Sequence, residues 1–302
     1  MTARLRVGVV GVGAISKLAH LPVLSRMRGV DVVALCDNDN AKARALADRF
    51  EVPDVFTDIE DLLEFDALDA VVLATPNHLH EPHALSALAA GIDVLCERPL
   101  ARTAKGVERV LAAAAKRERK VLVANNHRFR SDAQALERFI RGGELGRVSG
   151  FRGGSYLPRR ASEGWRSRRA EAGGGAFLDQ GFPLVDLALW LADFPAPVRV
   201  SAHFDRGRGR DAVETAMLVH LECADGSSHS FDASWSYVGE EERWWMECLA
   251  ARGSARLAPL RVVKELDCRP VTVSHTGATA RDSACIQSYR AQAAHFVAVV
   301  SG

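Results

Sequence analysis

The sequence predicts an α/β protein in which a doubly wound parallel sheet is followed by a second α/β domain with an open, mostly antiparallel sheet. Three observations indicate this fold class. Short, continuous apolar runs alternate with helical patterns over the first 125 residues, a glycine-rich turn follows the first run, and longer alternating segments fill the second half. Continuous apolar strands separated by helices are typical of parallel sheets buried on both faces, whereas alternation is typical of sheets with one solvated face.

The first half contains five apolar runs that we predict as strands. They lie at 5–10, 30–36, 71–74, 94–96 and 121–124. Helical patterns follow the first four runs, one ending near Met27 and the others at 40–49, 80–90 and 103–119. Strands and helices that alternate in this way predict a doubly wound sheet.

The pattern changes after residue 125, and we place the domain boundary there, with a first domain at 1–125 and a second at 126–302. Helices are predicted at 131–141, ended by two glycines, and at 182–191. Alternating segments predict strands at 198–204, 216–223, 228–235 and 244–249. Asp225-Gly226, between two of them, is typical of a tight turn, which favours antiparallel pairing.

The composition is that of an ordinary globular protein without a nucleic-acid or membrane footprint. The 302 residues are 48% hydrophobic and 25% charged, with a formal net charge of +1. No apolar run reaches the roughly 18 residues needed to span a bilayer. Six cysteines show no C-x-x-C spacing, which favours free thiols and a cytoplasmic setting.

The first apolar run leads into a glycine-rich turn, Gly11-Val12-Gly13-Ala14-Ile15-Ser16. Gly11 permits a tight turn, and Gly13 lets the backbone approach a pyrophosphate at the positive end of the following helix. Ser16 stands at the third glycine position of this fingerprint and is small enough for close packing of helix on strand. The motif predicts a dinucleotide site; the alternative is a tight turn without a ligand.

An acidic residue ends the second predicted strand, at the spacing that the dinucleotide interpretation requires. Asp37 lies about 20 residues after the glycine turn, where a carboxylate accepts hydrogen bonds from both ribose hydroxyls and repels a 2′-phosphate. Asn38 follows it in place of a basic residue. The sequence therefore predicts NAD rather than NADP as the cofactor.

Polar residues also follow the third main strand, at the edge where open α/β sheets bind ligands. Thr75 and Asn77 flank Pro76 and can present hydroxyl and amide groups to a ribose or nicotinamide, although an ordinary Asx turn is the alternative. Three histidines follow within one helix, but Glu81 is the only other ligand type near them. We therefore expect no metal site.

With these residues, the chain resembles the Gfo/Idh/MocA family of NAD(P)-dependent oxidoreductases over essentially its whole length. The first half carries the resemblance in GVGAISKLAHLP, ALCDND, ATPNHLHEPHALSALAAGIDVLCERPL and NNHRF, and the second in GELGRVSGFRG, WRSRRAEAGGGAFLDQGFPLVDLALWL and YRAQAAHF. The resemblance implies a Rossmann domain joined to an α/β domain that supports the substrate and often an oligomer interface. It also implies hydride transfer to or from a sugar, cyclitol or related alcohol, and a homo-oligomer, dimer or tetramer.

The resemblance further implies a Lys–Asp–His catalytic arrangement, drawn from E-K-P and D-x-x-x-H motifs. In this sequence Arg98 replaces the lysine, Asp179 is kept, and Pro183 replaces the histidine; Asp186 matches a further family acid. Arginine stays protonated in proteins and proline has no titratable side chain, so both changes remove proton-transfer capacity. Arg98 can still donate hydrogen bonds to an alkoxide or carbonyl oxygen.

Three interpretations follow from these departures. In the first, the protein is an oxidoreductase in which Arg98 polarises the substrate oxygen and the proton passes to His127, Tyr156, Asp179 or water. In the second, it binds NAD but catalyses elimination, epimerisation or glycoside cleavage by transient oxidation, with the cofactor recycled. In the third, it is a non-catalytic binding or regulatory relative, and arginines clamp an anionic ligand. Those arginines are Arg98, Arg128, Arg159 and Arg160.

We therefore expect two sets of site residues for a polyol or sugar oxidoreductase. The expected cofactor contacts are Gly11, Gly13, Ala14, Ile15, Asp37, Thr75, Pro76, Asn77, His80, Glu97 and Arg98. The expected substrate contacts are Arg128, Trp165, Arg166 and Asp179. The resemblance also implies a terminal helix that returns to the nucleotide domain. Because the sequence ends at Ser301-Gly302, we expect that helix to be missing.

Overall fold

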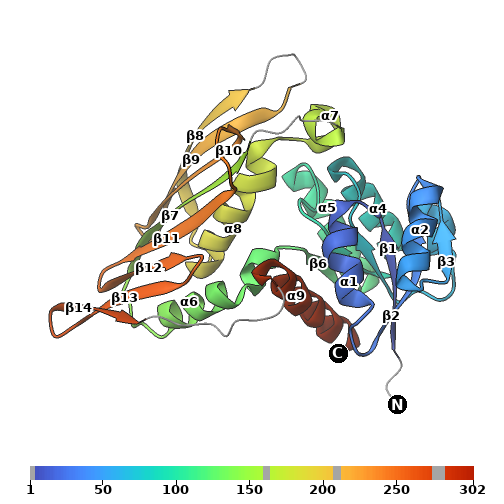
Figure 1. The fold of residues 1–302 in the computed structure, drawn as a ribbon, viewed down its shortest axis with the longest axis horizontal. Helices are drawn as coiled ribbons and strands as arrows, with labels where there is room; N and C mark the ends of the chain where they lie inside the picture. The colour runs from blue at the N-terminus through green and yellow to red at the C-terminus, as the bar shows by residue number, and fades with distance from the viewer. Residues whose placement is uncertain (1–3, 159–163, 207–211, 274–282) are drawn as a thin grey trace. The chain divides into compact units, whose positions relative to one another are not determined.

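The structure, a computed structural model, describes residues 4–158, 164–206, 212–273 and 283–302. The chain forms two compact units (Figure 1). Unit 1 comprises Met1–Asn126 and Asp282–Gly302, and unit 2 comprises His127–Arg281. The predicted second domain ran to residue 302, so the C-terminal segment belongs to a different unit from the one that the sequence suggested.

Unit 1 is built on a six-stranded, fully parallel sheet with the strand order β3-β2-β1-β4-β5-β6. The strands are β1 (Leu5–Val10), β2 (Val30–Cys36), β3 (Asp54–Phe56), β4 (Ala70–Leu73), β5 (Asp93–Cys96) and β6 (Val121–Val123). This order confirms the doubly wound fold class. The short strand β3 was not predicted, because its three half-buried residues form no distinct apolar run.

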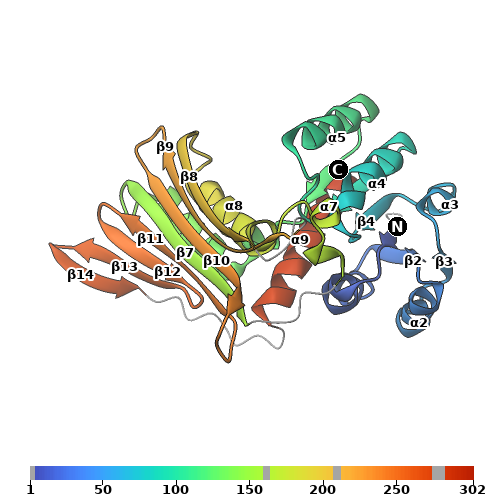
Figure 2. The ribbon, with the colours of Figure 1, turned by 90° about the horizontal axis from the view of Figure 1, so that it is seen from above.

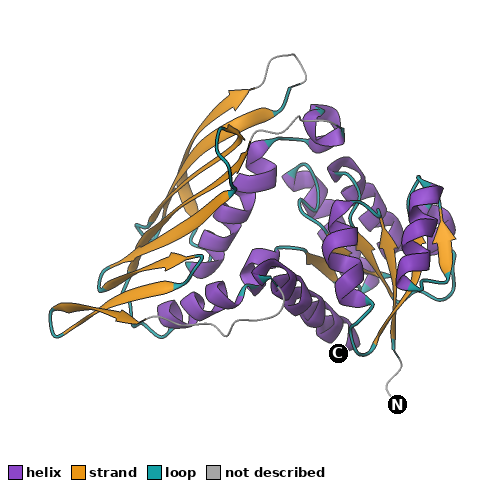
Figure 3. Cartoon of the chain, in the orientation of Figure 1, coloured by secondary structure: helices purple, strands orange, loops and turns teal. Residues whose placement is uncertain are grey.

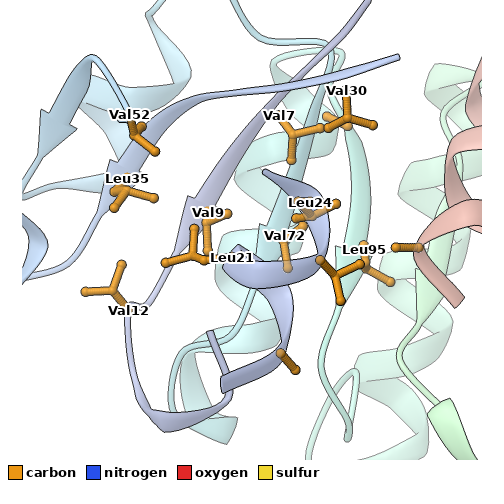
Figure 4. Close-up of a cluster of buried hydrophobic side chains, with 14 of the residues drawn as sticks. Val7, Val9, Val12, Leu21, Leu24, Val30, Leu35, Val52, Val72 and Leu95 are labelled. Carbon is orange, nitrogen blue, oxygen red and sulfur yellow. The ribbon is translucent and has the colours of Figure 1, made fainter. Parts of the chain in front are cut away.

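Helices cover both faces of this sheet (Figure 3). One face carries η1 (Ser16–His20), α1 (Leu21–Leu24), α2 (Asn40–Phe50) and α9 (Ala284–Ser301); the other carries α3 (Ile59–Leu63), α4 (Asn77–Ala89) and α5 (Ala104–Arg117). Side chains of each strand alternate between the two cores, so Val72 joins the first and Leu73 the second. Figure 4 shows the first core, where Leu21 and Leu24 lie near Val9 and Val72.

The C-terminal helix α9 packs on unit 1 beside α1 (Figure 1). Tyr289, Ala293 and Phe296 recur every three or four residues, so they share one helix face, and all three are buried in the first core. Ser283 caps the helix by accepting the backbone N–H of Ile286. The C-terminal residues, which the sequence analysis assigned to the second domain, therefore belong to unit 1.

Unit 2 contains an eight-stranded sheet with the order β14-β13-β12-β11-β7-β10-β9-β8. The strands are β7 (Val148–Pro158), β8 (Pro197–Arg206), β9 (Glu214–Cys223), β10 (Ser228–Tyr237), β11 (Arg243–Ala250), β12 (Gly253–Leu257), β13 (Arg261–Leu266) and β14 (Arg269–Val273). Among the strand pairs of this sheet in the described ranges, only β7–β10 is parallel, which confirms a mostly antiparallel sheet. Strand β7 was not predicted, because Gly150, Gly153 and Gly154 interrupt its apolar pattern.

The main helices of unit 2, α6 (Ser131–Arg141) and α8 (Phe182–Leu191), pack against one face of its sheet. Figure 2 shows α8 beside the strands. Both have the predicted bounds. Leu136 and Leu187 bring the helices into a core with Phe151, Phe231 and Met246 of the sheet. The remaining helical segments are η2 (Asn126–Phe129), η3 (Trp165–Ser167), α7 (Arg169–Ala172) and η4 (Phe177–Gly181). Within the described ranges, no helix is both long and apolar enough to cross a membrane.

Replacing Phe296 by alanine tests the placement of α9. Phe296 is 1% exposed in the first core, and truncating a buried phenylalanine costs about 3–5 kcal/mol. All five tryptophans lie in unit 2, so their fluorescence follows the unfolding of that unit, whereas far-ultraviolet circular dichroism follows both. We expect Phe296→Ala to lower the urea midpoint seen by circular dichroism and to leave the fluorescence midpoint in place.

Val299 supplies the matched control, because it lies on the same helix and is 38% exposed. Val299→Ala should change the free energy of unfolding by no more than about 0.5 kcal/mol. Equal effects of the two substitutions, or a shift confined to tryptophan fluorescence, would contradict the packing of α9 on unit 1.

Candidate functional site

The turn after β1 brings the ends of three strands of unit 1 together. Gly11 has a φ of +86°, and its N–H donates to the carbonyl of Cys36 at the end of β2, at 2.7 Å. A Cβ at Gly11 would lie 2.7 Å from the carbonyl oxygen of Ala74, just beyond β4. Since both the backbone conformation and the space exclude a side chain, only glycine fits this position.

The helix that follows this turn starts directly after Gly13. A Cβ at Gly13 would meet no atom within 4 Å, so the backbone here is open to a ligand. Ser16 is fully buried, and its hydroxyl donates to the carbonyl of Gly11 at 2.5 Å. The Ser16 hydroxyl therefore holds the turn on its buried side, and the side at Gly13 is unoccupied by protein atoms. Ala14 is exposed and Ile15 packs on the first core.

Asp37 is tied to the glycine turn by a direct hydrogen bond. Its Oδ2 accepts the backbone N–H of Val12 at 2.8 Å, and its Oδ1 accepts the N–H of Asp39 at 3.0 Å. The ammonium of Lys42 lies 3.6 Å from Oδ2. Each carboxylate oxygen has a second lone pair, so the group can still accept hydrogen bonds from hydroxyls.

His80 joins the loops that follow β4 and β5. Its Nε2 lies 2.7 Å from the carbonyl oxygen of Thr75, and its Nδ1 lies 2.7 Å from that of Pro99. The residue is 1% exposed, and burial lowers the pKa of its imidazole. Both ring nitrogens face backbone carbonyls, so His80 links the two loops. Its predicted cofactor contact stays a prediction.

The loop after β4 keeps the position that the sequence predicted for it. Thr75 and Pro76 are partly exposed, and Asn77 is buried at the start of α4. His83 lies 3.5 Å from the Thr75 hydroxyl, and burial lowers the pKa of that histidine to about 4. Among the described residues, no group of three or more histidine, cysteine or acidic side chains could hold a metal ion.

Glu97 and Arg98 follow β5 at the same edge of the sheet. The N–H of Glu97 donates to the carbonyl of Leu73 at 2.8 Å, and its Oε1 lies 2.9 Å from Nε2 of His20 in η1. Burial raises the pKa of Glu97, but the hydrogen bond and charge of His20 and the charge of Arg98 together bring it below its usual value. Sequence reasoning missed His20, although it stands one helical turn beyond Ser16 in the motif that opens the chain.

In unit 2, the glycine run before η4 is held by an acid that the sequence did not single out as a site residue. Glu214 at the start of β9 accepts the backbone N–H groups of Gly175 and Phe177 on its Oε1, at 2.7 and 3.1 Å. A Cβ at Gly175 would lie 2.1 Å from the Glu214 carbonyl oxygen. The glycine therefore allows η4 to start against β9.

Asp179 on η4 is oriented by two side-chain donors. The indole N–H of Trp235 donates to its Oδ2 at 3.2 Å, and the amide of Gln180 donates to the same oxygen at 3.0 Å. The Ser155 hydroxyl in turn donates to Gln180 at 2.6 Å. Within the described residues, no hydrogen bond to Oδ1 of Asp179 is present, and the residue is partly exposed.

Tyr156 lies on the other face of this sheet. Neighbouring residues of a strand point to opposite faces, and the preceding Ser155 reaches the face that carries Asp179 and Gln180. The Tyr156 hydroxyl donates to Asp232, and burial together with this carboxylate raises its pKa to about 12. The structure therefore argues against the predicted role of Tyr156 as proton acceptor beside Asp179.

Arg128 is engaged inside unit 2. Its guanidinium forms a two-pronged ion pair with Asp186 of α8, with Nε 2.8 Å from Oδ2, and lies 5.1 Å from the ring of Phe194. Nε and one Nη of the guanidinium thus hold α8, and the substrate contact of Arg128 stays a prediction. The neighbouring His127 packs edge-on against the ring of Trp244 at 5.4 Å and is partly exposed.

The remaining predicted residues have simple settings. Trp165 and the exposed Arg166 form η3, and the guanidinium lies 4.5 Å from the indole ring. Pro183 is buried at the start of α8, so no titratable side chain stands where the resemblance implied a histidine. Arg159 and Arg160 lie outside the described residues.

Comparison with known proteins covers both units. Residues 5–125 match the family model "Oxidoreductase family, NAD-binding Rossmann fold", and residues 133–256 match "GFO/IDH/MocA C-terminal domain". D-glucoside 3-dehydrogenase of Escherichia coli is 31% identical over 66% of this chain and 57% of its own length. 1,5-Anhydro-D-fructose reductase of Ensifer adhaerens is 33% identical over 73% of this chain and 66% of its own length. The chain thus spans less than two thirds of either relative.

A solved structure gives the same result for the fold. GenD2 from gentamicin A biosynthesis, crystallised in complex with NAD, is 27% identical and superposes with a TM-score of 0.85, covering 99% of this chain and 87% of that one. The two family matches fall on the two sheets, and the first includes the glycine turn, the acid at the end of β2 and the corner after β5. The chain is therefore a member of the Gfo/Idh/MocA family of oxidoreductases.

Proposed function

We propose that the protein is an NAD-dependent oxidoreductase that transfers hydride between nicotinamide and a sugar, cyclitol or related hydroxy or keto compound. One observation carries this proposal: the open backbone at Gly13 is tied to Asp37 through the N–H of Val12. The backbone donors for a pyrophosphate and the carboxylate acceptor for the ribose hydroxyls are thereby joined by a direct hydrogen bond. The carbohydrate names of the relatives support the substrate class.

The residues at the sheet edge fit a dinucleotide. Gly11 and Gly13, with Ala14 and Ile15 in the first helical turn, hold the pyrophosphate at the positive end of the helix. Asp37 accepts from the ribose hydroxyls, and its charge disfavours a 2′-phosphate, so we propose NAD rather than NADP. Bound NAD supplies a hydride acceptor. The loops at 75–77 and 97–98 contribute the remaining cofactor contacts.

Arg98 and Asp179 take the chemical roles in this proposal. Arg98 donates hydrogen bonds to the substrate oxygen and stabilises the charge that develops there. Asp179, held by Trp235 and Gln180, directs its open Oδ1 to a substrate hydroxyl and accepts its proton. His127 is the second candidate for this proton, and Trp165 and Arg166 contribute substrate contacts.

A second candidate function is NAD binding with cofactor-recycling or non-redox chemistry, or ligand binding without turnover. The buried Pro183 favours it, because the proton relay that the family resemblance implied has no side chain at that position. A homo-oligomer and a cytoplasmic location remain part of the proposal on the strength of the sequence alone.

Asp37→Ala tests the cofactor site. The substitution removes the ribose acceptor and the bond that holds Val12, so we expect NADH affinity, measured by calorimetry, to fall about tenfold to hundredfold. NADPH affinity should fall less. The control is Asp39→Ala, which removes an exposed cap of α2 and should leave the NADH affinity unchanged. Equal losses in the two variants would contradict a ribose contact at Asp37.

Arg98→Met tests the chemical role of the arginine. Loss of an oxyanion donor typically costs about a hundredfold in turnover, so we expect a drop of that size with the NADH dissociation constant within about threefold of the parent. Arg117→Met, the same change on an exposed part of α5, is the control. Unchanged turnover in Arg98→Met would rule out this role.

The double substitution Arg98→Lys with Pro183→His separates the two candidate functions. It restores the side chains that the resemblance implied. If the parent is an oxidoreductase, it should already form NADH from a polyol substrate in the same assay. Alcohol-dependent NADH formation in the double variant, absent in the parent, would favour the second function.

A further inference from the structure

A cluster of largely buried side chains includes Glu97, the residue before Arg98 in the loop after β5. His20 comes from η1, Glu97 follows β5, and Tyr289 comes from α9, so three distant parts of the chain of unit 1 meet here. His20 Nε2 lies 2.9 Å from Glu97 Oε1, and the side chains are 2% and 13% exposed. The ring of Tyr289 packs edge-on against the His20 ring at 5.4 Å.

The charges in this cluster act on one another. Burial is the largest influence on the pKa of Tyr289 and raises it, the charge of Glu97 adds to this, and the charge of Arg98 opposes it. Arg98 directly follows Glu97 after β5, and its charge acts on both Glu97 and Tyr289. The titratable groups around the Glu97 carboxylate are His20 of η1, His80 of α4, Cys96 of β5, Arg98 of the same corner and Tyr289 of α9.

We propose that His20 is a positioning residue, which fixes the Glu97 carboxylate and, through the attraction between opposite charges, the Arg98 guanidinium at the nucleotide end of the sheet. His20 ends the π-helical turn η1, which continues the helix that opens at the glycine turn. His20 thereby connects the glycine turn, the predicted pyrophosphate site, to the loop at 97–98, where Arg98 is proposed to act on the substrate. The relevance to catalysis rests on the proposed function, in which Arg98 acts on the substrate oxygen.

The first test is a double-mutant cycle that needs no ligand. In the parent at neutral pH, Glu97 is ionised and held by His20, so Glu97→Gln should lower the urea midpoint. Because the folded pKa of Glu97 is lowered, this loss should shrink as the pH falls through that pKa. In a His20→Leu background the carboxylate is buried without its donor, so Glu97→Gln should cost little or should stabilise. An equal drop in the urea midpoint on Glu97→Gln in the parent and in His20→Leu would contradict the interaction between His20 and Glu97.

The second test reads the position of Arg98 without an activity. Phenylglyoxal modifies accessible arginines, and peptide mass spectrometry gives the rate at each residue. We expect Arg98, partly buried in the parent, to react about tenfold faster in His20→Leu, with the rate at the exposed Arg117 unchanged. His20→Gln keeps an N–H donor for Glu97 and should restore the parent rate.

Histidine 229 supplies the structural control, because it is fully buried in unit 2 and contacts Ser227 and the backbone of Phe151. His229→Gln should lower stability without changing the modification rate of Arg98. An unchanged Arg98 rate in His20→Leu, or an equal rise in His229→Gln, would overturn the positioning role.

Turnover then separates the inference from the proposed function. If both hold, His20→Leu lowers kcat at least tenfold with the NADH dissociation constant unchanged, and His20→Gln recovers most of it. The modification rate of Arg98 could rise in His20→Leu while the parent neither oxidises a polyol with NAD nor oxidises NADH with a keto compound. In that case the proposed function fails and the positioning role stands. If the parent turns over and His20→Leu matches it, the positioning role fails and the proposed function stands.

Discussion

The contact between Gly11 and the chain beyond β4 is the constraint on which the organisation of unit 1 depends. A side chain at Gly11 would place its Cβ 2.7 Å from the carbonyl of Ala74, and the φ of +86° excludes most other residues. Because this space is empty, β1 can turn sharply between the ends of β2 and β4. The following helix then begins with an open backbone at Gly13, while the buried Ser16 hydroxyl fixes the turn from the core side.

Side chains from elsewhere in the chain tie the loops at this edge together. Asp37 holds the glycine turn through Val12, His80 joins the carbonyls of Thr75 and Pro99, and His20 holds the carboxylate of Glu97. Each contact is buried or half-buried, so the loss of one partner leaves a polar group without water or a substitute, at a cost of about 1–3 kcal/mol. A preorganised edge of this kind suits a reaction in which charge develops at one oxygen. In unit 2 the same principle holds Asp179, which Trp235 and Gln180 orient from two sides.

The elements predicted from the sequence are those in which the order of apolar and polar residues follows the burial of each position. β1 and β2 are continuous apolar runs, and α6 and α8 have clear ends, so their bounds match the structure. β7 was missed because Gly153 and Gly154, which close packing against Trp245 requires, erase its alternation. The placement of residues 284–301 was missed because no helix was predicted over them and the predicted second domain ran to residue 302, so nothing in the pattern showed which core receives their apolar face. The shape of the glycine turn was predictable because a motif fixes the backbone there. The partners of Tyr156, Arg128 and His80 were not, because strand face and ion-pair partner depend on residues far away in the chain.

Hydride chemistry at this edge requires that the intact chain bind a nicotinamide dinucleotide with a preference set by Asp37. Calorimetric titration of the unmodified 302-residue protein with NADH and with NADPH measures this directly. We expect NADH to bind with a one-to-one stoichiometry and NADPH to bind more weakly, because a 2′-phosphate meets the charge of Asp37. Binding of neither dinucleotide would contradict the assignment of the Gly11–Gly13 turn as a cofactor site, and with it both enzymatic interpretations of the protein.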